Sequence, residues 1–301
     1  MASGLLLLLV LLGAWLWTPD LDRAELEARH ARGPADFVQV AGLRLHVRDD
    51  GPRDAPAVVM LHGFGASLHT WEDWAQALSV RHRVIRFDLP AAGLTGADPG
   101  RDYSDERSIQ VVTELMDKLG VARASVVGHS MGGRIAWRLA AAQPQRVQRL
   151  VLVAPDGFAS PGFEYGKAPE VGAVVELMRH VLPRAVVTMS LKPAYADPAQ
   201  MTDERATRYH ELLRAPGVRP GLIDRMRQLV LRDPVPMLQT IAAPTLLLWG
   251  EQDAMVPAAN AQDYLRVMPR ARLVLLPAVG HIPQEEGGAA ALAAVQAFLA
   301  E

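Results

Sequence analysis

Short apolar runs alternate with helical patterns along most of this chain, and the alternation restricts the folds that it can adopt. The apolar runs cover residues 57–61, 83–89, 124–128, 149–154, 244–250 and 272–278. Strands that are apolar throughout are typical of parallel sheets with helices on both faces. Helical spacing between and after them covers residues 67–78, 105–119, 131–142, 257–268 and 285–299. We therefore expect βαβ units and a mostly parallel, doubly covered sheet.

Two regions depart from this alternation. Residues 37–49 alternate apolar and polar side chains around Gly42, which predicts an antiparallel hairpin. Between Pro155 and about Pro236 there is no strand pattern, but there are several helical stretches and many prolines. A structureless loop of that length is rare in a compact domain. We expect residues 157–236 to form a helical lid on a core made of residues 37–156 and 237–301.

Some apolar side chains of the expected lid are predicted to line a substrate site. The candidates are Phe158, Phe163, Tyr165, Met178, Leu182, Met189, Leu191 and Tyr195. A lid of this kind excludes water and controls access to a site. The sequence therefore favours small or medium apolar groups as ligands.

The overall composition excludes several classes of function. The net charge is -2 over 301 residues, whereas nucleic-acid-binding proteins usually carry a basic excess. The chain has no cysteine, so disulfides, thiolate metal sites and cysteine nucleophiles are excluded. No pair of histidines has the helical spacing and the carboxylate partner of a metal site. Neither nucleic-acid binding nor metal binding is expected.

The first 17 residues are the most apolar stretch of the chain. Residues 4–17 (GLLLLLVLLGAWLW) carry no charge and, with residues 1–3, approach the length of a membrane-spanning helix. Trp15 and Trp17 lie where interfacial anchors occur. We expect residues 1–19 to be a hydrophobic anchor on a membrane-associated protein, and residues 20–36 to be a linker. The alternatives are a cleaved signal, which would make the protein periplasmic or secreted, and a helix packed on the domain or a partner.

The most specific motif is Gly128-His129-Ser130-Met131-Gly132, which lies directly between a predicted strand and a predicted helix. A serine on such a sharp turn presents its hydroxyl at the carboxyl edge of the sheet, and glycines beside it remove side chains that would collide. The structural alternative is a turn with a helix-capping serine. We interpret Ser130 as a nucleophile.

A serine hydroxyl needs a general base to act as a nucleophile. His281 follows the last predicted strand and precedes the final helix, so it can reach over the carboxyl edge of the sheet. His62 and His129 lie within the turns themselves and are interpreted as structural. The other histidines, at 30, 46, 69, 82, 180 and 210, have no comparable context. We predict that His281 is the base.

The third member of such a triad holds the imidazole in one tautomer. Asp253, in the turn after the strand at residues 244–250, is the candidate. Glu251 is a weaker competitor, and Asp156, after the strand at residues 149–154, is the stronger one. Asp253 lies in a compact turn closed by Pro257, whereas Asp156 lies where the chain enters the expected lid. The sequence favours Asp253.

An acyl-transfer site also needs two N–H donors for the oxyanion. Met131, the residue after the nucleophile, is expected to supply one. Phe64, in the turn His62-Gly63-Phe64-Gly65 after the first buried strand, is expected to supply the other.

This ordered set of motifs resembles the α/β-hydrolase family over about residues 37–301. The motifs are HGFG at residue 62, GHSMGG at 128, WGEQD at 249 and GHIPQEE at 280. The resemblance implies an eight-stranded sheet, a lid inserted after the sixth strand and no cofactor. It also implies Ser130, Asp253 and His281 as triad. The loop that often reads D-x-P-G-x-G in this family has Ala91 and Ala92 instead, which leaves its shape open.

The function expected from these residues is hydrolysis of small-molecule carboxylic esters through an acyl-enzyme. Two alternatives remain. One is carbon–carbon bond hydrolysis of the meta-cleavage type, whose members resemble the run GHSMGG but commonly have asparagine where His129 stands. The other is a non-catalytic ligand receptor on the same fold. Epoxide hydrolases and dehalogenases of this fold use aspartate where Ser130 stands and are disfavoured.

Overall fold

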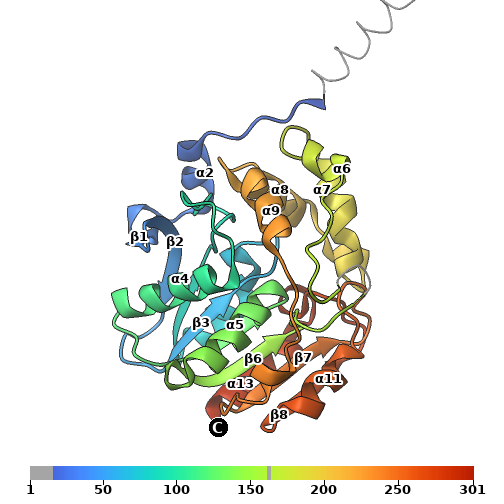
Figure 1. Cartoon of the computed structure of the whole chain (residues 1–301). Coiled ribbons are helices and arrows are strands. Elements are labelled where there is room, and N and C mark those ends of the chain that lie inside the picture. The colour runs from blue at the N-terminus through green and yellow to red at the C-terminus, as the bar shows by residue number, and fades with distance from the viewer. Residues whose placement is uncertain (1–15, 161–163) are drawn as a thin grey trace, which may run out of the picture.

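The protein is described from a computed structural model, which covers residues 16–160 and 164–301. This part of the chain contains one eight-stranded sheet with the strand order β1-β2-β4-β3-β5-β6-β7-β8 (Figure 1). The strands are β1 (Phe37–Val40), β2 (Leu43–Asp50), β3 (Ala57–Leu61), β4 (Arg83–Phe87), β5 (Ala124–His129), β6 (Val147–Val153), β7 (Thr245–Gly250) and β8 (Ala271–Leu276). β2 is antiparallel to β1 and β4, and the other pairs are parallel. The predicted α/β class, with a mostly parallel sheet, is confirmed.

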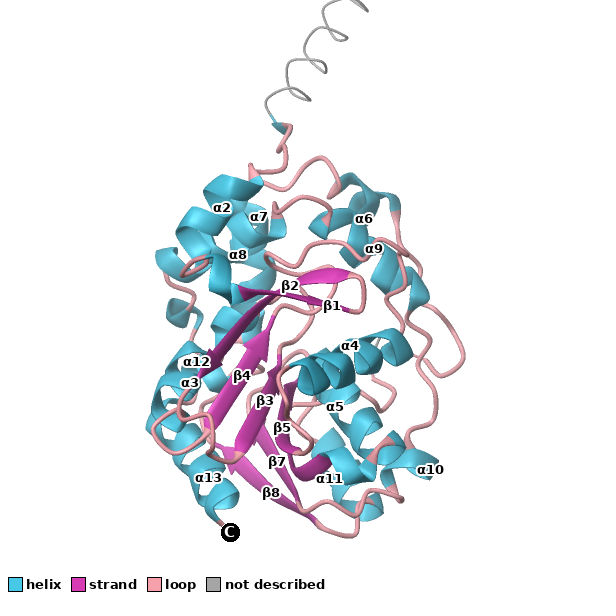
Figure 2. Ribbon diagram, turned by 90° about the vertical axis from the view of Figure 1, so that its left-hand side faces the viewer, coloured by secondary structure: helices cyan, strands magenta, loops and turns pink. Residues whose placement is uncertain are grey.

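Helices cover both faces of the sheet (Figure 2). One face carries α3 (Glu72–Leu78), α12 (Pro283–Glu286) and α13 (Gly288–Ala300), and the other carries α4 (Asp105–Lys118), α5 (Met131–Ala142), α10 (Val235–Leu238) and α11 (Asn260–Val267). The final helix predicted at residues 285–299 is divided in two. Gly287 separates the parts, and Gly288, the first residue of α13, has a φ of 51° that a continuous helix does not allow.

Side chains of each central strand point alternately into the two layers, as the pleat requires. In β3, Val59 and Leu61 join the larger core cluster under α4 and α5. Val58 and Met60 join a second cluster with the side chains of α3 and α13. All four are fully buried. Burial on both faces explains why these strands are apolar throughout.

The segment between β6 and β7 is helical and lies at the carboxyl edge of the sheet. It contains α6 (Ala173–Leu177), α7 (Arg184–Leu191), α8 (Asp203–Leu213) and α9 (Val218–Gln228) (Figure 1). We call residues 157–236 the helical segment. Its apolar side chains Leu182, Val187, Tyr195 and Tyr209 form one cluster with Ala66 and Ile282, which lie outside the segment. The segment therefore packs as a small layer against the turns at the edge of the sheet.

The stretch predicted as a linker is an ordered part of the fold. It contains α2 (Arg23–His30), which is capped by Asp22, whose side chain accepts from the N–H of Glu25 at 3.1 Å. Leu26 is fully buried in a cluster with Leu212 and Val218 of the helical segment. Residues 23–30 thus form a helix that docks on the helical segment through Leu26.

The predicted membrane-associated location is corrected here. Within residues 16–160 and 164–301, no helix is long and apolar enough to cross a membrane. Residues 1–15 of the predicted anchor lie outside the described residues. The end of that apolar run contacts the helical segment instead: the ring of Trp17 stacks on His180 at 5.1 Å, and the N–H of Thr18 donates to the His180 carbonyl at 2.8 Å. The sequence carries no local signal of this protein contact, so from the sequence alone Trp17 resembles an interfacial anchor.

Candidate active site

Ser130 occupies the tight turn between β5 and α5. Its φ of 51° and ψ of -119° are unusual for a residue with a side chain. Backbone hydrogen bonds hold the turn on both sides. The N–H of Ser130 donates to the Val153 carbonyl at 3.0 Å, and the Ser130 carbonyl accepts from the backbone N–H groups of Arg134 and Asp156, both at 3.1 Å. Strain of this kind persists only where the surroundings fix it, and it is concentrated at functional sites.

The glycines around this turn are required by close backbone contacts. A Cβ added to Gly128 would lie 2.3 Å from the Gly132 carbonyl oxygen, and one added to Gly132 would lie 2.3 Å from the carbonyl oxygen of Leu61. Both contacts are far inside van der Waals distance, and backbone atoms cannot move aside as a flexible side chain can. The G-x-S-x-G pattern therefore reflects how closely α5 approaches β3 and β5.

His281 and Asp253 are brought together as predicted. The Nδ1 atom of His281 lies 2.8 Å from Oδ2 of Asp253, and both side chains are buried. The other carboxylate oxygen of Asp253 accepts the N–H groups of Met255 and Val256, each at 2.8 Å. Because an ionised carboxylate only accepts, Nδ1 carries the proton and Nε2 keeps a free lone pair.

Ser130 and His281 line the same two cavities at the carboxyl edge of the sheet. Within the described residues, the Ser130 hydroxyl makes no hydrogen bond to the His281 ring. Such hydrogen bonds are often long before substrate binds, so this does not separate the two groups functionally. His281 is held in place by its own N–H, which donates to the Ala194 carbonyl of the helical segment at 2.7 Å.

Asp156, the competing acid, is engaged elsewhere. Its carboxylate forms an ion pair with Arg134, which also binds Asp105 at 3.0 Å. Burial alone would lower the pKa of Arg134, but the two carboxylates outweigh it and raise that pKa. The backbone carbonyl of Asp156 accepts from Tyr264 at 3.0 Å. The carboxylate of Asp156 thus anchors α5, whereas that of Asp253 faces the His281 ring.

The two expected oxyanion donors lie on adjacent turns. β3 and β5 are parallel neighbours with Leu61 in register with Gly128, so the turns that follow them meet. Met131 is the first residue of α5, and its N–H therefore has no acceptor within the helix. Among the described residues, no acceptor is found for the N–H of Phe64 either. Both residues line the smaller cavity together with Ser130.

His62 and His129 have the structural roles expected of them. His62 bridges two turns: its Nε2 accepts from the N–H of Leu89 at 3.0 Å, and its Nδ1 donates to the Gly63 carbonyl at 2.8 Å. Nε2 of His129 donates to the His281 carbonyl at 2.8 Å. Burial lowers the pKa of both imidazoles, so both rings stay neutral and act as fixed hydrogen-bonding groups.

Two cavities meet at Ser130. The larger has a volume of about 380 Å³ and extends under the helical segment, where Arg219, Leu222, Ile223 and Met226 face it from one side of α9. Their spacing of three and four residues is that of one helix face. The smaller, of about 220 Å³, is lined by Arg134, Asp156 and Arg225 among others. The residues common to both cavities are Phe64, Ser130, Met226, Met255 and His281.

The apolar residues predicted to roof the site divide into three groups. Met178, Leu182 and Leu191 line the larger cavity, and Phe158 lines the smaller. Tyr195 is buried in the core of the helical segment, and Tyr165 and Met189 are exposed. Phe163 lies outside the described residues.

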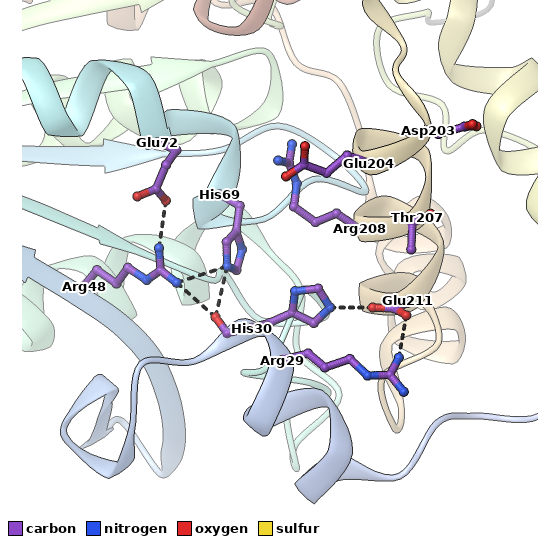
Figure 3. Close-up of a pocket in the computed structure, with 10 residues that line it drawn as sticks. All are labelled: Arg29, His30, Arg48, His69, Glu72, Asp203, Glu204, Thr207, Arg208 and Glu211. Atoms are coloured by element: carbon purple, nitrogen blue, oxygen red, sulfur yellow. Dashed lines mark hydrogen bonds and ion pairs between the residues drawn. The ribbon is translucent and has the colours of Figure 1, made fainter.

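A third cavity, of about 580 Å³, lies between α2, β2 and α8, away from Ser130 (Figure 3). Several of its charged groups pair with one another: Arg48 binds Glu72 at 2.7 Å, and the ring of His30 lies 2.8 Å from Glu211 (Figure 3). Burial lowers the pKa of His69, which lies beside Arg48, to about 3. This cavity is larger, but no serine is among its described lining residues, so the candidate nucleophile lies in the other two cavities.

The loop at residues 88–93, which has Ala91 and Ala92 where the family pattern differs, still forms a closed turn. Ala91 adopts a φ of 63°, a left-handed conformation that glycine takes more readily. The loop is held by Asp88, whose carboxylate accepts from Leu68 at 2.7 Å and from Leu94 at 2.9 Å. α9 packs on the same loop, where Gly221 lets the Ala91 methyl approach. The substitution therefore leaves the loop closed and covered by α9.

Two contributors to the site were not found from the sequence. Arg225 is one of many arginines, and only the fold brings it to the smaller cavity. Glu286 accepts from the N–H groups of Gly280 at 2.7 Å and Ala196 at 2.9 Å, which ties the His281 turn to the helical segment. Its place in the GHIPQEE motif was the only local signal.

Comparison with known proteins gives relatives that align over most of the chain. A sequence profile of the alpha/beta hydrolase fold matches residues 56–288. The dihydrolipoyllysine-residue acetyltransferase component of the acetoin cleaving system of Pseudomonas putida is 32% identical over 282 residues, which cover 92% of this chain and 72% of that protein. The pimeloyl-[acyl-carrier protein] methyl ester esterase of Nitrosomonas europaea is 30% identical over 242 residues, which cover 79% and 93%. In structure, the enol-lactonase from Burkholderia xenovorans LB400 superposes with a TM-score of 0.76 at 27% identity, over 88% of this chain and 100% of that one.

Proposed function

Because the chain belongs to the α/β-hydrolase fold family, we propose that it hydrolyses carboxylic esters through an acyl-enzyme formed on Ser130. The observation that carries the proposal is the His281–Asp253 pair, with its 2.8 Å contact, opening on the same cavities as a strained serine between β5 and α5. The names of the three relatives support it, since an acetyltransferase, a methyl ester esterase and a lactonase all act on acyl groups.

In the first half of the reaction, Nε2 of His281 accepts the Ser130 proton as Oγ attacks the ester carbonyl carbon. The lone pair on Nε2 is available because Asp253 holds the proton on Nδ1. The carbonyl oxygen becomes an oxyanion, which accepts from the N–H groups of Phe64 and Met131. The positive end of the α5 dipole adds to this stabilisation.

The tetrahedral intermediate then collapses as the imidazolium of His281 protonates the leaving alkoxide. The alcohol departs, and the acyl group remains on Ser130. In the second half, His281 deprotonates a water molecule that attacks the acyl carbon through the same oxyanion site. The carboxylic acid leaves, and Ser130 regains its proton.

We propose that the helical segment acts as a lid and that the acyl group occupies the larger cavity. Aliphatic side chains of α6, α7 and α9 contribute to the wall of that cavity, and its volume of about 380 Å³ is in the range of small-molecule sites. Transfer of apolar surface out of water stabilises a bound acyl chain by roughly 25 cal/mol for each Å² buried. A small or medium apolar acyl group is the expected substrate.

Pre-steady-state hydrolysis of p-nitrophenyl esters tests this function. The wild-type protein is expected to release a burst of p-nitrophenol that matches the enzyme concentration, while Ser130→Ala shows no burst and loses roughly 10⁴- to 10⁶-fold in turnover. Esters from acetate to palmitate report on the cavity, with butanoate to octanoate preferred. Turnover of a dienoic keto acid with negligible ester hydrolysis would contradict the proposal in favour of carbon–carbon bond cleavage. Binding without turnover of either would favour a receptor.

A further inference from the structure

The two cavities that meet at Ser130 differ in charge. In the larger cavity Arg219 is the one charged side chain among the described lining residues, and Asp20 neutralises it at 2.6 Å. In the smaller cavity Arg134 is matched by Asp156, but Arg225 also lines the wall. The wall of the smaller cavity therefore holds two arginines and one carboxylate, while Asp105, the second partner of Arg134, lies outside the lining.

Arg225 is buried without a carboxylate partner. Its guanidinium donates to the carbonyls of Pro90 at 2.9 Å and Tyr103 at 3.2 Å, and it has a long contact of 3.5 Å with the hydroxyl of Ser108. Across the described ranges, its guanidinium forms no ion pair with a carboxylate, and residues 1–15 and 161–163 contain no aspartate or glutamate. The neighbouring arginine of the same cavity, Arg134, has two such partners.

An unpaired buried cation is costly, and this one stays charged. Burial is the largest influence on Arg225 and lowers its pKa to about 10, with Asp105 opposing and Arg134 adding to the shift. At neutral pH the group is still protonated. Proteins rarely keep an ionised group out of water without an opposite charge. An anionic ligand in the smaller cavity would supply that charge.

We propose that Arg225 recognises an anionic group, such as a carboxylate, on the alcohol half of the ester that Ser130 cleaves. This inference rests on the proposed function. The apolar acyl half gains most from the larger cavity, so the alcohol half occupies the smaller one, and the scissile bond lies at the residues that the cavities share. When the acyl–oxygen bond breaks, His281 protonates the alkoxide, and the alcohol leaves with its carboxylate still beside Arg225. The substrate class is then an apolar acyl ester of a hydroxy acid.

The test uses the full chain and two esters of equal shape, para-butanoyloxybenzoate and para-butanoyloxybenzamide. Their leaving groups differ in reactivity, but that difference cancels when the ratio of their kcat/KM values is compared between proteins. Arg225→Met removes the hydrogen bonds to the charged carboxylate. It is therefore expected to lower the benzoate-to-benzamide ratio of kcat/KM by roughly 10- to 100-fold. Arg225→Lys keeps the charge and is expected to keep part of the preference.

The matched control is Arg227→Met, two residues further along α9. Arg227 lies outside both cavities and is half-exposed beside Glu176 and Asp224, so the ratio is expected to stay at the wild-type value. Benzoate and benzamide as competitive inhibitors of the wild-type protein give a readout that needs no variant. Benzoate is expected to bind more tightly, and equal or weaker binding would overturn the proposal even if Arg225→Met does not fold.

The outcomes separate this inference from the function on which it rests. A wild-type protein that cleaves neither ester refutes the ester hydrolase itself. A wild-type protein that cleaves both, with the same ratio in Arg225→Met, refutes only the role of Arg225. If Arg225→Met instead slows esters that carry the carboxylate on the acyl half, the assignment of the cavities is reversed and the proposal fails.

Discussion

Replacement of Asp253 by asparagine is the sharpest test of the proposal that Asp253 prepares His281 to act as the base. The carboxylate uses one oxygen for two backbone N–H groups at 2.8 Å and the other for Nδ1 of His281. An asparagine can keep the backbone contacts only by placing its oxygen there. Its NH₂ group then faces the His281 ring, where it needs an acceptor.

This geometry fixes the expected magnitude. Facing an NH₂ donor, the His281 ring is driven to the tautomer with its proton on Nε2, which can no longer accept the Ser130 proton. Loss of the correct tautomer costs about 10⁴ in kcat in triads of this kind. Folding is expected to change little, because the size of the side chain and the backbone contacts are retained.

Asp156→Asn provides the comparison. It removes the charge that pairs with Arg134, but Arg134 keeps Asp105 at 3.0 Å. Weakening one partner of a buried, hydrogen-bonded charge is expected to cost roughly 1–3 kcal/mol of stability. The rate of acyl transfer is expected to fall by less than about 10-fold, since the His281 ring is untouched.

The assay is hydrolysis of p-nitrophenyl butanoate by both variants at equal concentration, with the melting temperature as a check on folding. The expected pattern is a stable but nearly inactive Asp253→Asn and a destabilised but active Asp156→Asn. The reverse pattern would show that the acid follows β6 and would refute the assignment of Asp253.

Three further variants test the structural account. Gly132→Ala places a methyl carbon 2.3 Å from a backbone oxygen and is expected to abolish activity or folding. The control Gly172→Ala has open space at its Cβ and is expected to be tolerated. Similar melting temperatures for the two variants would contradict this expectation. Burial alone would raise the pKa of Glu72, but neighbouring arginines lower it from 4.5 to about 2, so its contribution to stability is present above pH 4.5 and disappears as the pH falls towards 2. Glu72→Gln should therefore lower the melting temperature at neutral pH but not near pH 2, and an equal loss at both would refute the linkage. Leu26→Ala is expected to lower the free energy of unfolding in urea by about 2–4 kcal/mol, because the Leu26 side chain is fully buried. A loss below about 0.5 kcal/mol would indicate that residues 20–36 are a linker after all.

The sheet could be predicted because its strands carry a local signal. Runs such as residues 57–61 are apolar throughout, and burial on both faces is the only common reason for that pattern. The motif at Ser130 is local as well, since its glycines are required by close contacts with neighbouring backbone atoms. Asp253 and His281 could be chosen because each follows a strand at the same edge of the sheet.

The remaining features depend on contacts between distant parts of the chain. The stacking of Trp17 on His180 and the burial of Leu26 join the first residues of the described chain to the helical segment, and no local pattern reports either contact. In the sequence Arg225 does not differ from the other arginines in predicted helices. Its contact with the Pro90 carbonyl appears only once α9 packs on the loop at Pro90. Partner choice among many arginines and acids is set by the tertiary fold, which is why the charge of the smaller cavity could not be anticipated.

The most direct test of the central claim is mass spectrometry of the protein after reaction with a fluorophosphonate. In the proposed mechanism the Nε2 lone pair of His281 activates the Ser130 hydroxyl and the N–H groups of Phe64 and Met131 stabilise the adduct, so a single adduct is expected. Peptide mapping is expected to place it on Ser130, with no adduct on Ser130→Ala. An unmodified wild-type protein, or an adduct on any other residue, would contradict the assignment of Ser130 as the nucleophile.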